Sequence, residues 1–469
     1  MQVPILNGVF TDATGDFRTA YPLNRVPVPK STGISEGYLR PAEGIETFGA
    51  GPGVGRGGIA WRGSLYRVMG TKFVRVSDTG AITELGDIPG DDMVSMDYSF
   101  DRLGIWAGGF LYFWDGATLT KITDADFLPA YSGCWIAGYW MSTDGTSLVV
   151  TDLNDPTSVN PLRYGSAESD PDKIQAVTKL KNEAVAAGRH TFEFFSNIGA
   201  TTTGGFPFSR IDGAQVSRGI VGRHAFAHLA ESIAFVGSGR NEALAVYLLG
   251  NGSTAKISTR EIDVMLSEYS EAALADVYVE SRIESGHAHL MIHLPDVTLV
   301  YDLAASQAAD EPVWFRLGSA ISGQGRYRAR GFVRCYDRWI VEDPLSANLG
   351  AMTSEVGSHY GAAVGWQFDT LMVYNQSKGA AIHEIELVAL PGRVAFGAQP
   401  VVFTSYSEDG ETWSMERPTP AGAQGNRRAR IAWRRQGRIR GYRVQRFRGT
   451  SDAHVGFVRL EIQPEALSV

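Results

Sequence analysis

The repetition of one short theme constrains the fold of this chain more than any other feature. A small-residue turn leads into alternating apolar and aromatic residues and then another turn, and this theme returns seven times, roughly 35–55 residues apart. Repeats of about 40–50 residues that contain only short strands and turns are typical of propeller blades. The period therefore predicts a β-propeller of six or seven blades. The centres of the repeats are Leu65-Tyr66-Arg67-Val68, Ile105-Trp106-Ala107, Tyr139-Trp140-Met141, Ala184-Val185-Ala186, Ala234-Phe235-Val236, Leu290-Met291-Ile292 and Trp339-Ile340-Val341.

A β-sandwich with similar strand spacing is the alternative explanation of the same period. Sandwiches seldom sustain one period over about three hundred residues, so the propeller is favoured. Composition agrees with an all-β protein, because the chain contains 54 glycines and 11% of its residues are aromatic.

The 469 residues are enough for more than one domain, and we expect three regions. Residues 1–45 are punctuated by proline and are expected to form an extended N-terminal arm or contact segment. Residues 46–345 are predicted to form the propeller, with one helical insertion from Thr259 to Asp276. Residues 346–469 are predicted to form a C-terminal β-sandwich.

Several features bear on where the protein is made. No apolar stretch reaches the roughly 18–20 residues that cross a bilayer, and the start, Met1-Gln2-Val3-Pro4, lacks the pattern of a secretion signal. We therefore expect no membrane insertion. Cys134 and Cys335 are expected to be buried free thiols, as suits a reducing cytoplasm. The formal net charge of -8 argues against a protein that coats nucleic acid.

Two local patterns imitate ligand sites. Gly53-Val54-Gly55-Arg56-Gly57-Gly58 has the spacing of a dinucleotide-binding loop, but strand-like Ile59-Ala60-Trp61 follows where that loop requires a helix. His287, His289 and His293 share strand parity and could bind a transition metal together with Asp296. We favour a glycine-rich turn for the first pattern, and surface or hydrogen-bonded structural histidines for the second.

An acidic group could suggest calcium or a catalytic carboxylate pair, but it lies in loops where Asp forms side-chain turns. Its members are Asp152, Asp155, Glu168, Asp170 and Asp172. The sequence also lacks a Ser/His/Asp order, a Walker loop, zinc-finger spacing and HExxH. We therefore expect no cofactor, no metal and no enzyme, although propeller enzymes often collect their catalytic groups from distant loops.

The most unusual local composition holds ten arginines and no acidic residue within 22 positions. Alternation in Arg438-Ile439-Arg440 and Arg446-Phe447-Arg448 places apolar side chains on one strand face and guanidinium groups on the other. This arginine-rich segment has three possible explanations, namely an interface with an acidic protein surface, contact with phosphate, or a solvated strand face. We predict the protein interface. Its candidate residues are Arg427, Arg428, Arg430, Arg434, Arg435, Arg438, Arg440, Arg443, Arg446 and Arg448.

Several runs, in the same order along nearly the whole chain, resemble the packaged-DNA stabilisation proteins, or tail hubs, of short-tailed bacteriophages. None of these runs is a catalytic motif. The most specific are Thr151-Asp152-Leu153-Asn154-Asp155-Pro156, Phe192-Glu193-Phe194-Phe195, Arg218-Gly219-Ile220-Val221-Gly222, Ile292-His293-Leu294-Pro295 and Trp433-Arg434-Arg435-Gln436-Gly437-Arg438-Ile439-Arg440.

The resemblance implies a structural protein of the virion tail. Such a hub is expected to form a hexameric ring that joins portal and adaptor proteins to the tail spikes or fibres and the tail needle. It would retain the packaged double-stranded DNA and later provide its exit conduit. Assembly in the cytoplasm of the host bacterium is also implied. An acidic chain suits a DNA conduit because it repels phosphates.

Two other functions stay open at this point. A propeller glycan hydrolase or carbohydrate-binding tail protein would need several carboxylates or arginines converging at the central opening of the propeller. A viral receptor-binding module is expected to be trimeric rather than hexameric.

Overall fold

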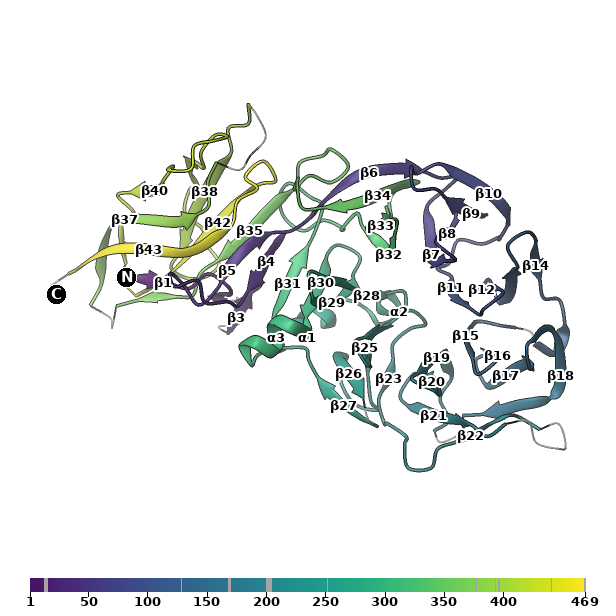
Figure 1. Cartoon of the computed structure of the whole chain (residues 1–469). Coiled ribbons are helices and arrows are strands. Elements are labelled where there is room, and N and C mark those ends of the chain that lie inside the picture. The colour runs from purple at the N-terminus through teal and green to yellow at the C-terminus, as the bar shows by residue number, and fades with distance from the viewer. Residues whose placement is uncertain are drawn as a thin grey trace. The chain divides into compact units, whose positions relative to one another are not determined.

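The computed structural model describes residues 1–11, 16–127, 129–167, 170–199, 205–250, 252–375, 378–392, 394, 397–439 and 441–467. The chain divides into two compact units (Figure 1). Unit 1 consists of Met1–Glu46, Glu284–Arg328 and Met352–Val469. Unit 2 consists of Thr47–Ile283 and Ala329–Ala351.

Unit 2 is built from successive antiparallel sheets of short strands, separated by tight turns. The strands of the first five sheets are β7 (Gly55–Trp61), β8 (Ser64–Met69), β9 (Lys72–Val76), β10 (Ile82–Asp87), β11 (Ser95–Tyr98), β12 (Leu103–Ala107), β13 (Phe110–Trp114), β14 (Leu119–Lys121), β15 (Ser132–Ile136), β16 (Tyr139–Thr143), β17 (Ser147–Asp152), β18 (Asp155–Ser166), β19 (Ile174–Leu180), β20 (Glu183–Gly188), β21 (Phe192–Asn197), β22 (Phe208–Arg210), β23 (Gly219–Ile220), β24 (Phe226–Leu229), β25 (Ser232–Ser238), β26 (Ala245–Gly250) and β27 (Ser253–Lys256).

Four of these sheets are meanders in which strands that are consecutive in sequence pair with each other, and in the fifth sheet β25 pairs with both β23 and β24. The orders are β10-β9-β8-β7, β11-β12-β13-β14, β15-β16-β17-β18, β19-β20-β21-β22 and β23-β25-β26-β27, with β24 also paired to β25. Figure 1 shows these sheets following one another along the chain. Consecutive pairing through short turns is the connectivity of propeller blades.

A further sheet closes the series with strands from both ends of the repeat region. It runs in the order β32 (Arg330–Cys335), β33 (Arg338–Glu342), β34 (Asn348–Thr353) and β6 (Gly44–Ala50). Strand β28 (Tyr278–Glu284) precedes three strands that pair antiparallel in chain order, β29 (His287–His293), β30 (Thr298–Asp302) and β31 (Trp314–Leu317). All seven repeats of the sequence theme lie on strands, namely β8, β12, β16, β20, β25, β29 and β33. The predicted β-propeller is confirmed.

The hydrophobic core of unit 2 lies between neighbouring sheets. Tyr66 and Phe73 of the first sheet pack with Trp114 of the second. Trp106 and Trp140 join the second sheet to the third in the same way. The first strands of neighbouring sheets also contact one another, so that β32 meets β7, β7 meets β11, β11 meets β15 and β15 meets β19. The alternation of apolar residues in the repeats therefore supplies both faces of each sheet with side chains for its neighbours.

Helices are few and short. The predicted helical insertion is present as two helices, α1 (Arg260–Ser267) and α2 (Glu271–Ala275). They are separated because Ser270 takes an extended conformation and its hydroxyl accepts a hydrogen bond from the Ala273 N–H over 3.2 Å, which starts the second helix. The sequence did not predict the 3₁₀ turn η1 (Ala125–Phe127) or the helix α3 (Leu303–Ala309). None of the helices in the described residues has the length and the apolar run needed to span a membrane.

Unit 1 contains the predicted β-sandwich. One sheet has the order β4-β5-β43-β37-β40, with β1 also paired to β43 and β41 to β37. The other has the order β35-β42-β38-β39, with β36 also paired to β42. A hairpin of β2 (Gly8–Thr11) and β3 (Phe17–Ala20) accompanies them. The sandwich strands are β1 (Gln2–Val3), β4 (Arg25–Val28), β5 (Tyr38–Pro41), β35 (Gly365–Asp369), β36 (Val373–Tyr374), β37 (Ala380–Ala389), β38 (Val401–Ser407), β39 (Arg417–Pro420), β40 (Ile431–Arg434), β41 (Arg438–Ile439), β42 (Tyr442–Thr450) and β43 (Phe457–Ala466).

Aromatic side chains fill the core between the two sheets of the sandwich. Phe368 stacks on Phe447 and on Trp366, and Trp433 packs against Phe447 from the opposite sheet. Strand β37 alternates buried and less buried residues, as expected of a strand with one face on a core. The proline-rich N-terminal segment contributes β1, β4 and β5 to this unit, so its extended conformation is accounted for by pairing within the chain.

Candidate functional site

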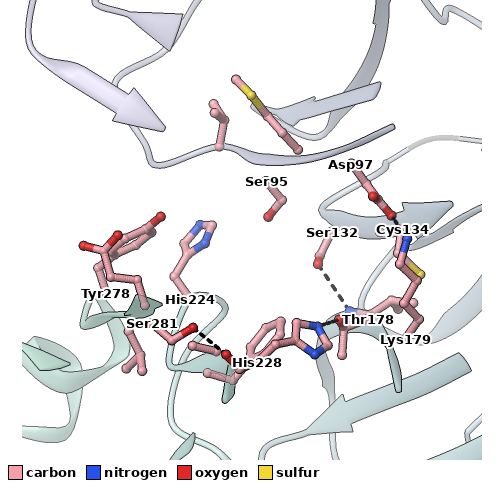
Figure 2. A pocket seen from close by; sticks show the side chains of 18 of the residues that line it. Ser95, Asp97, Ser132, Cys134, Thr178, Lys179, His224, His228, Tyr278 and Ser281 are labelled. Carbon is pink, nitrogen blue, oxygen red and sulfur yellow. Dashed lines mark hydrogen bonds and ion pairs between the residues drawn. The ribbon is translucent and has the colours of Figure 1, made fainter. Parts of the chain in front are cut away.

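Strands from successive sheets surround a cavity of about 410 Å³ in unit 2 (Figure 2). Its lining comes from six strands, β7, β11, β15, β19, β24 and β28, which are far apart in sequence. A cavity lined by one strand from each of several successive sheets is the central opening of a propeller. A hydrolase with this fold is expected to collect its catalytic groups at this opening.

One lysine links three consecutive sheets at the edge of this cavity. Lys179 Nζ on β19 donates to Asp97 Oδ2 on β11 over 2.6 Å and to the Trp135 carbonyl oxygen on β15 over 2.9 Å. The Trp135 N–H donates to the same Asp97 oxygen over 2.8 Å. The Asp97 side chain is 17% exposed and that of Lys179 is 36% exposed, so the pair is only partly screened by solvent. Asp97 is therefore used to hold sheets together.

Burial disfavours the charged forms of His224, His228 and Cys134, which also line the cavity. Burial lowers the pKa of His224 to about 4, with a smaller contribution from Arg223. Burial, followed by the charge of Lys179, lowers the pKa of His228, whose Nε2 lies 3.0 Å from Thr178 Oγ1. Burial also raises the pKa of the Cys134 thiol, which disfavours the thiolate needed for nucleophilic attack.

The second carboxylate of the described lining is Glu280, and it too has structural partners. Its two oxygens accept hydrogen bonds from the backbone N–H groups of Gly331 and Phe332, over 3.0 and 2.7 Å. A glycoside hydrolase needs two carboxyl groups facing one substrate bond. Asp97 and Glu280 instead bind neighbouring strands of the protein, so the described lining contains no assembled pair of that kind.

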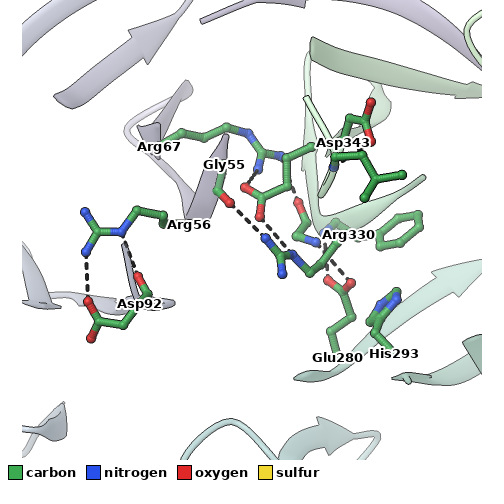
Figure 3. A network of polar contacts seen from close by, with 12 residues as sticks. Gly55, Arg56, Arg67, Asp92, Glu280, His293, Arg330 and Asp343 are labelled. Carbon is green, nitrogen blue, oxygen red and sulfur yellow. Dashed lines mark hydrogen bonds and ion pairs between the residues drawn. The ribbon is translucent and has the colours of Figure 1, made fainter. Parts of the chain in front are cut away.

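A buried network of charges connects the first and last sheets of unit 2 (Figure 3). Arg67 on β8 and Glu342 on β33 have fully buried side chains, and their charged atoms lie 3.1 Å apart. Arg67 also donates to the carbonyl oxygens of Gly331 and Ile340, over 2.8 Å each. Arg330 contacts the other Glu342 oxygen over 3.2 Å and donates to the Gly55 carbonyl oxygen over 2.9 Å. The network fixes the register between sheets whose sequences are far apart.

Four of the ten predicted interface arginines form ion pairs within their own chain. Arg430 and Arg434 contact Glu384, over 2.8 and 3.0 Å, and Arg430 also contacts Glu386. Arg446 makes a two-point contact with Asp369, over 2.8 and 2.7 Å, and Arg448 pairs with Glu416. Their charges are compensated by acidic residues of neighbouring segments, because strand pairing brings together what the sequence separates.

Arg443 was predicted as an interface residue, but the structure places its side chain inside unit 1. Its side chain is buried, stacks on the Tyr406 ring at 3.7 Å and donates to Gln445 Oε1 over 3.1 Å. Burial lowers its pKa to about 10. The alternation of β42 places Arg443 on the inner side of the strand, so it cannot contact a partner in the folded chain. Arg440 lies outside the described residues.

The remaining four arginines are exposed and have no carboxylate partner among the described residues. We call them the free-arginine patch, and they are Arg427, Arg428, Arg435 and Arg438. They lie beside or on β40 and β41, and β40 is the last strand in the order of its sheet. Exposed cations at a sheet edge can receive an acidic partner, and they also prevent unwanted strand pairing.

Two of the three candidate histidines share one partner, whereas the described candidate acidic residues each have a different one. His287 and His289 converge on Asp302, whereas His293 Nδ1 lies 3.0 Å from Thr298 Oγ1. Of the acidic group, Asp152 pairs with Arg163 and Asp170 with Arg240, and Asp172 accepts from the His190 N–H. Asp155 caps its own turn through the Thr157 N–H, and Glu168 lies outside the described residues. The described acidic residues have separate partners and do not form one cluster.

The glycine-rich run forms a turn and the start of a strand, and the two cysteines are buried thiols, as predicted. The run continues directly into β7, and Gly57 has a φ of 136°, which an L side chain rarely adopts. Cys134 and Cys335 are both buried and free.

The buried Arg67–Glu342 pair and the Lys179 contacts were not predicted. An arginine within an apolar strand theme is a signal of a buried partner, but the sequence does not say which residue that partner is.

The protein has two modules. The first is a propeller whose first and last sheets are joined by a buried ion network, and the second is a sandwich with an arginine-rich edge. The polar groups described above stabilise this fold. The chain belongs to the bacteriophage P22 Gp10 family: the β-propeller model of that family matches residues 1–357, and its β-sandwich model matches residues 365–465.

A curated relative matches the chain from end to end. The tail hub protein gp10 of Salmonella phage P22 is 28% identical over 458 residues, which cover 94% of each chain. Among solved structures, the Neurospora crassa Pan2 WD40 domain has a TM-score of 0.41 at 12% identity and covers 66% of this chain and 94% of its own. PorZ of Porphyromonas gingivalis has a TM-score of 0.39 at 12% identity, with 80% and 46% covered. These two structural likenesses are too distant to carry an argument.

Proposed function

We propose that this protein is a structural tail hub of a short-tailed bacteriophage. The observation that carries the proposal is the match of both family models in order, together with the end-to-end similarity to a protein named tail hub. The cavity of unit 2 supports a structural role, because the two carboxylates of its described lining bind neighbouring strands. The glycan hydrolase and carbohydrate-binding alternatives gain no support from the family or from this relative.

In the finer form of the proposal, six copies form a ring between the portal and adaptor proteins and the tail spikes or fibres and needle. The ring retains packaged DNA and provides the conduit through which double-stranded DNA leaves. The net charge of -8 supports this, since an acidic wall repels phosphates and does not hold DNA during exit. We further infer assembly in the cytoplasm of the host bacterium and a role without catalysis.

We also propose which parts of the chain serve these contacts. Residues 46–345 would act as the propeller module, residues 346–469 as the sandwich module, and residues 1–45 as the contact segment. The free-arginine patch would bind acidic side chains of a neighbouring protein, because arginine forms two-point contacts with carboxylates. Strand β18 exposes Leu162 and Tyr164, at 73% and 60% of their surfaces, and such apolar exposure suits burial against another subunit.

A phage that carries a nonsense mutation in the gene for this chain tests the proposed function. On a non-suppressing host we expect particles that have filled their heads but lack the distal tail parts and lose their DNA. Supply of the wild-type chain in trans should restore tailed, DNA-retaining particles. Particles that keep both their DNA and a complete tail without this chain would contradict the hub function.

The role without catalysis has its own test. The purified chain is incubated with capsular and lipopolysaccharide glycans of the host, and released reducing ends are measured. We expect no release above a heat-denatured control. Release that disappears in an Asp97→Asn variant would show instead that the cavity is an active site.

A further inference from the structure

Two histidines and a carboxylate on adjacent strands of unit 1 place three ligand atoms in one small volume. His287 and His289 lie two positions apart on β29, so they project from the same face of the strand. Asp302 on β30 lies directly opposite His289 in the strand register. Their ligand atoms all lie within 4.8 Å of one another.

The distances suit a tetrahedral ion. His289 Nε2 lies 3.3 Å and His287 Nδ1 2.7 Å from the same Asp302 oxygen, Oδ2. Two ligands that each stand about 2.0–2.2 Å from zinc at a tetrahedral angle are roughly 3.3 Å apart. His289 already meets this spacing. His287 needs a small movement, which its 35% exposed side chain permits.

The surroundings prepare His289 and Asp302 to act as ligands. His289 Nδ1 faces Glu284 Oε2 at 3.8 Å, and Arg40 holds that carboxylate over 2.7 Å. A proton on Nδ1 would point towards Glu284 and leave the Nε2 lone pair facing Asp302, which is the arrangement of a carboxylate-supported metal ligand. The Ala305 N–H donates to Asp302 Oδ1 over 2.9 Å and so leaves Oδ2 for the two imidazoles.

The charge balance also calls for a cation. Asp302 is 1% exposed, and no lysine or arginine among the described residues forms an ion pair with it. Buried carboxylates are normally paired with a cation or bound to a metal. Imidazole nitrogens and one carboxylate are ligands that suit zinc and its first-row neighbours, and they do not suit magnesium or calcium.

We propose that His287, His289 and Asp302 form a binding site for a divalent transition-metal ion of the zinc class, with Glu284 as a positioning residue for His289. The half-exposed His287 leaves a fourth coordination position open to solvent. The ion would join β29 to β30 and stabilise this part of unit 1.

Zinc alone is the probe for the test. The full chain is treated with a chelator, freed of it by gel filtration and titrated with Zn²⁺ by calorimetry, and the visible absorption of the Co²⁺-substituted chain reports the coordination geometry. We expect one ion per chain and a tetrahedral cobalt spectrum. His287→Gln, at the partly exposed position, should weaken binding at least about tenfold and remove that spectrum.

The Asp302→Asn variant tests whether Asp302 acts as a metal ligand or only caps the helix α3. Asparagine keeps an oxygen that can accept the hydrogen bond from the Ala305 N–H, but it loses the negative charge. We expect it to weaken binding by at least about tenfold with unchanged circular dichroism. His383→Gln is the matched control, since exposed His383 lies 2.7 Å from Glu465 and imitates a surface histidine–carboxylate pair. It should bind zinc like the wild type. Absence of binding in the wild type, or equal binding by all the variants, would overturn the site.

Discussion

The guanidinium group of Arg67 illustrates how far single residues can be understood from the sequence. Arg67 stands within the first repeat, Leu65-Tyr66-Arg67-Val68, where an arginine among apolar strand residues indicates a buried partner. That partner, Glu342, lies 275 residues away, and no pattern in one sequence connects the two. The sequence therefore indicated that Arg67 has a buried partner, but it did not indicate that the partner is Glu342.

The Arg67–Glu342 pair gives the first prediction. Arg67→Met leaves the Glu342 charge buried with only Arg330 beside it, and removing one partner of a buried pair costs about 3–5 kcal/mol. We expect a loss of that size in the free energy of unfolding, measured by urea denaturation. Arg75→Met is the control, because Arg75 lies exposed on β9 and its loss should change stability by less than about 0.5 kcal/mol. Equal stability of the two variants would show that the network does not hold the sheets together.

His359 gives a prediction about pH. Burial, with a smaller contribution from Arg328, lowers its pKa from 6.5 to about 4, and its Nδ1 lies 2.7 Å from Ser319 Oγ. Between these two values the unfolded chain binds a proton that the folded chain does not bind, so stability falls as the pH falls. The wild type should lose about 2 kcal/mol from this group between pH 7 and pH 5.

The contribution of His359 to the pH dependence of stability is isolated by comparing variants in denaturant titrations at pH 7 and at pH 5. His359→Gln cannot take up the proton, so its stability should fall by about 2 kcal/mol less than that of the wild type over the same range. His383→Gln replaces an exposed histidine and should keep the wild-type pH dependence. A His359→Gln variant that loses as much stability as the wild type would contradict the assignment.

At the scale of elements, periodicity predicted more than composition did. The seven theme repeats lie on seven strands because apolar alternation is a property of each strand and needs no distant partner. The helical insertion was placed correctly, but its division at Ser270 depends on one hydroxyl cap. The arginine-rich segment shows the opposite case. Its charge is segregated in sequence, yet Glu384 and Asp369 reach it from other strands.

The free-arginine patch gives the prediction for this scale. A variant in which its four residues, Arg427, Arg428, Arg435 and Arg438, become serine should fold normally but bind its neighbour in the tail at least about tenfold more weakly at physiological salt. The loss should shrink at high salt, where the wild-type contact is also screened. Sedimentation of the chain with its adaptor measures both effects.

Two controls make this experiment specific. Serine at Arg75, Lys181, Arg334 and Arg338 removes the same charge from exposed positions of unit 2 and should leave assembly unchanged. Arg443→Ser should instead destabilise the fold, because that side chain is buried. If the patch variant assembles like the wild type at every salt concentration, the four arginines form a solvated edge.

For the whole molecule, the order of propeller and sandwich followed from the change of pattern along the sequence, and the resemblance to tail hubs suggested the role. The division into units could not be predicted, because Glu284–Arg328 returns to unit 1 after most of unit 2 has been completed. The convergence of His287 and His289 on Asp302 also escaped prediction, since it depends on the strand register and the sequence offered Asp296 as the nearer carboxylate.

The central claim is that this chain is a structural ring component of a phage tail. Native mass measurement of the purified protein, with and without its adaptor protein, tests it most directly. We predict that the adaptor-bound assembly contains six copies of the 50.9 kDa chain. A mass that corresponds to one or three copies in the presence of the adaptor would contradict the ring.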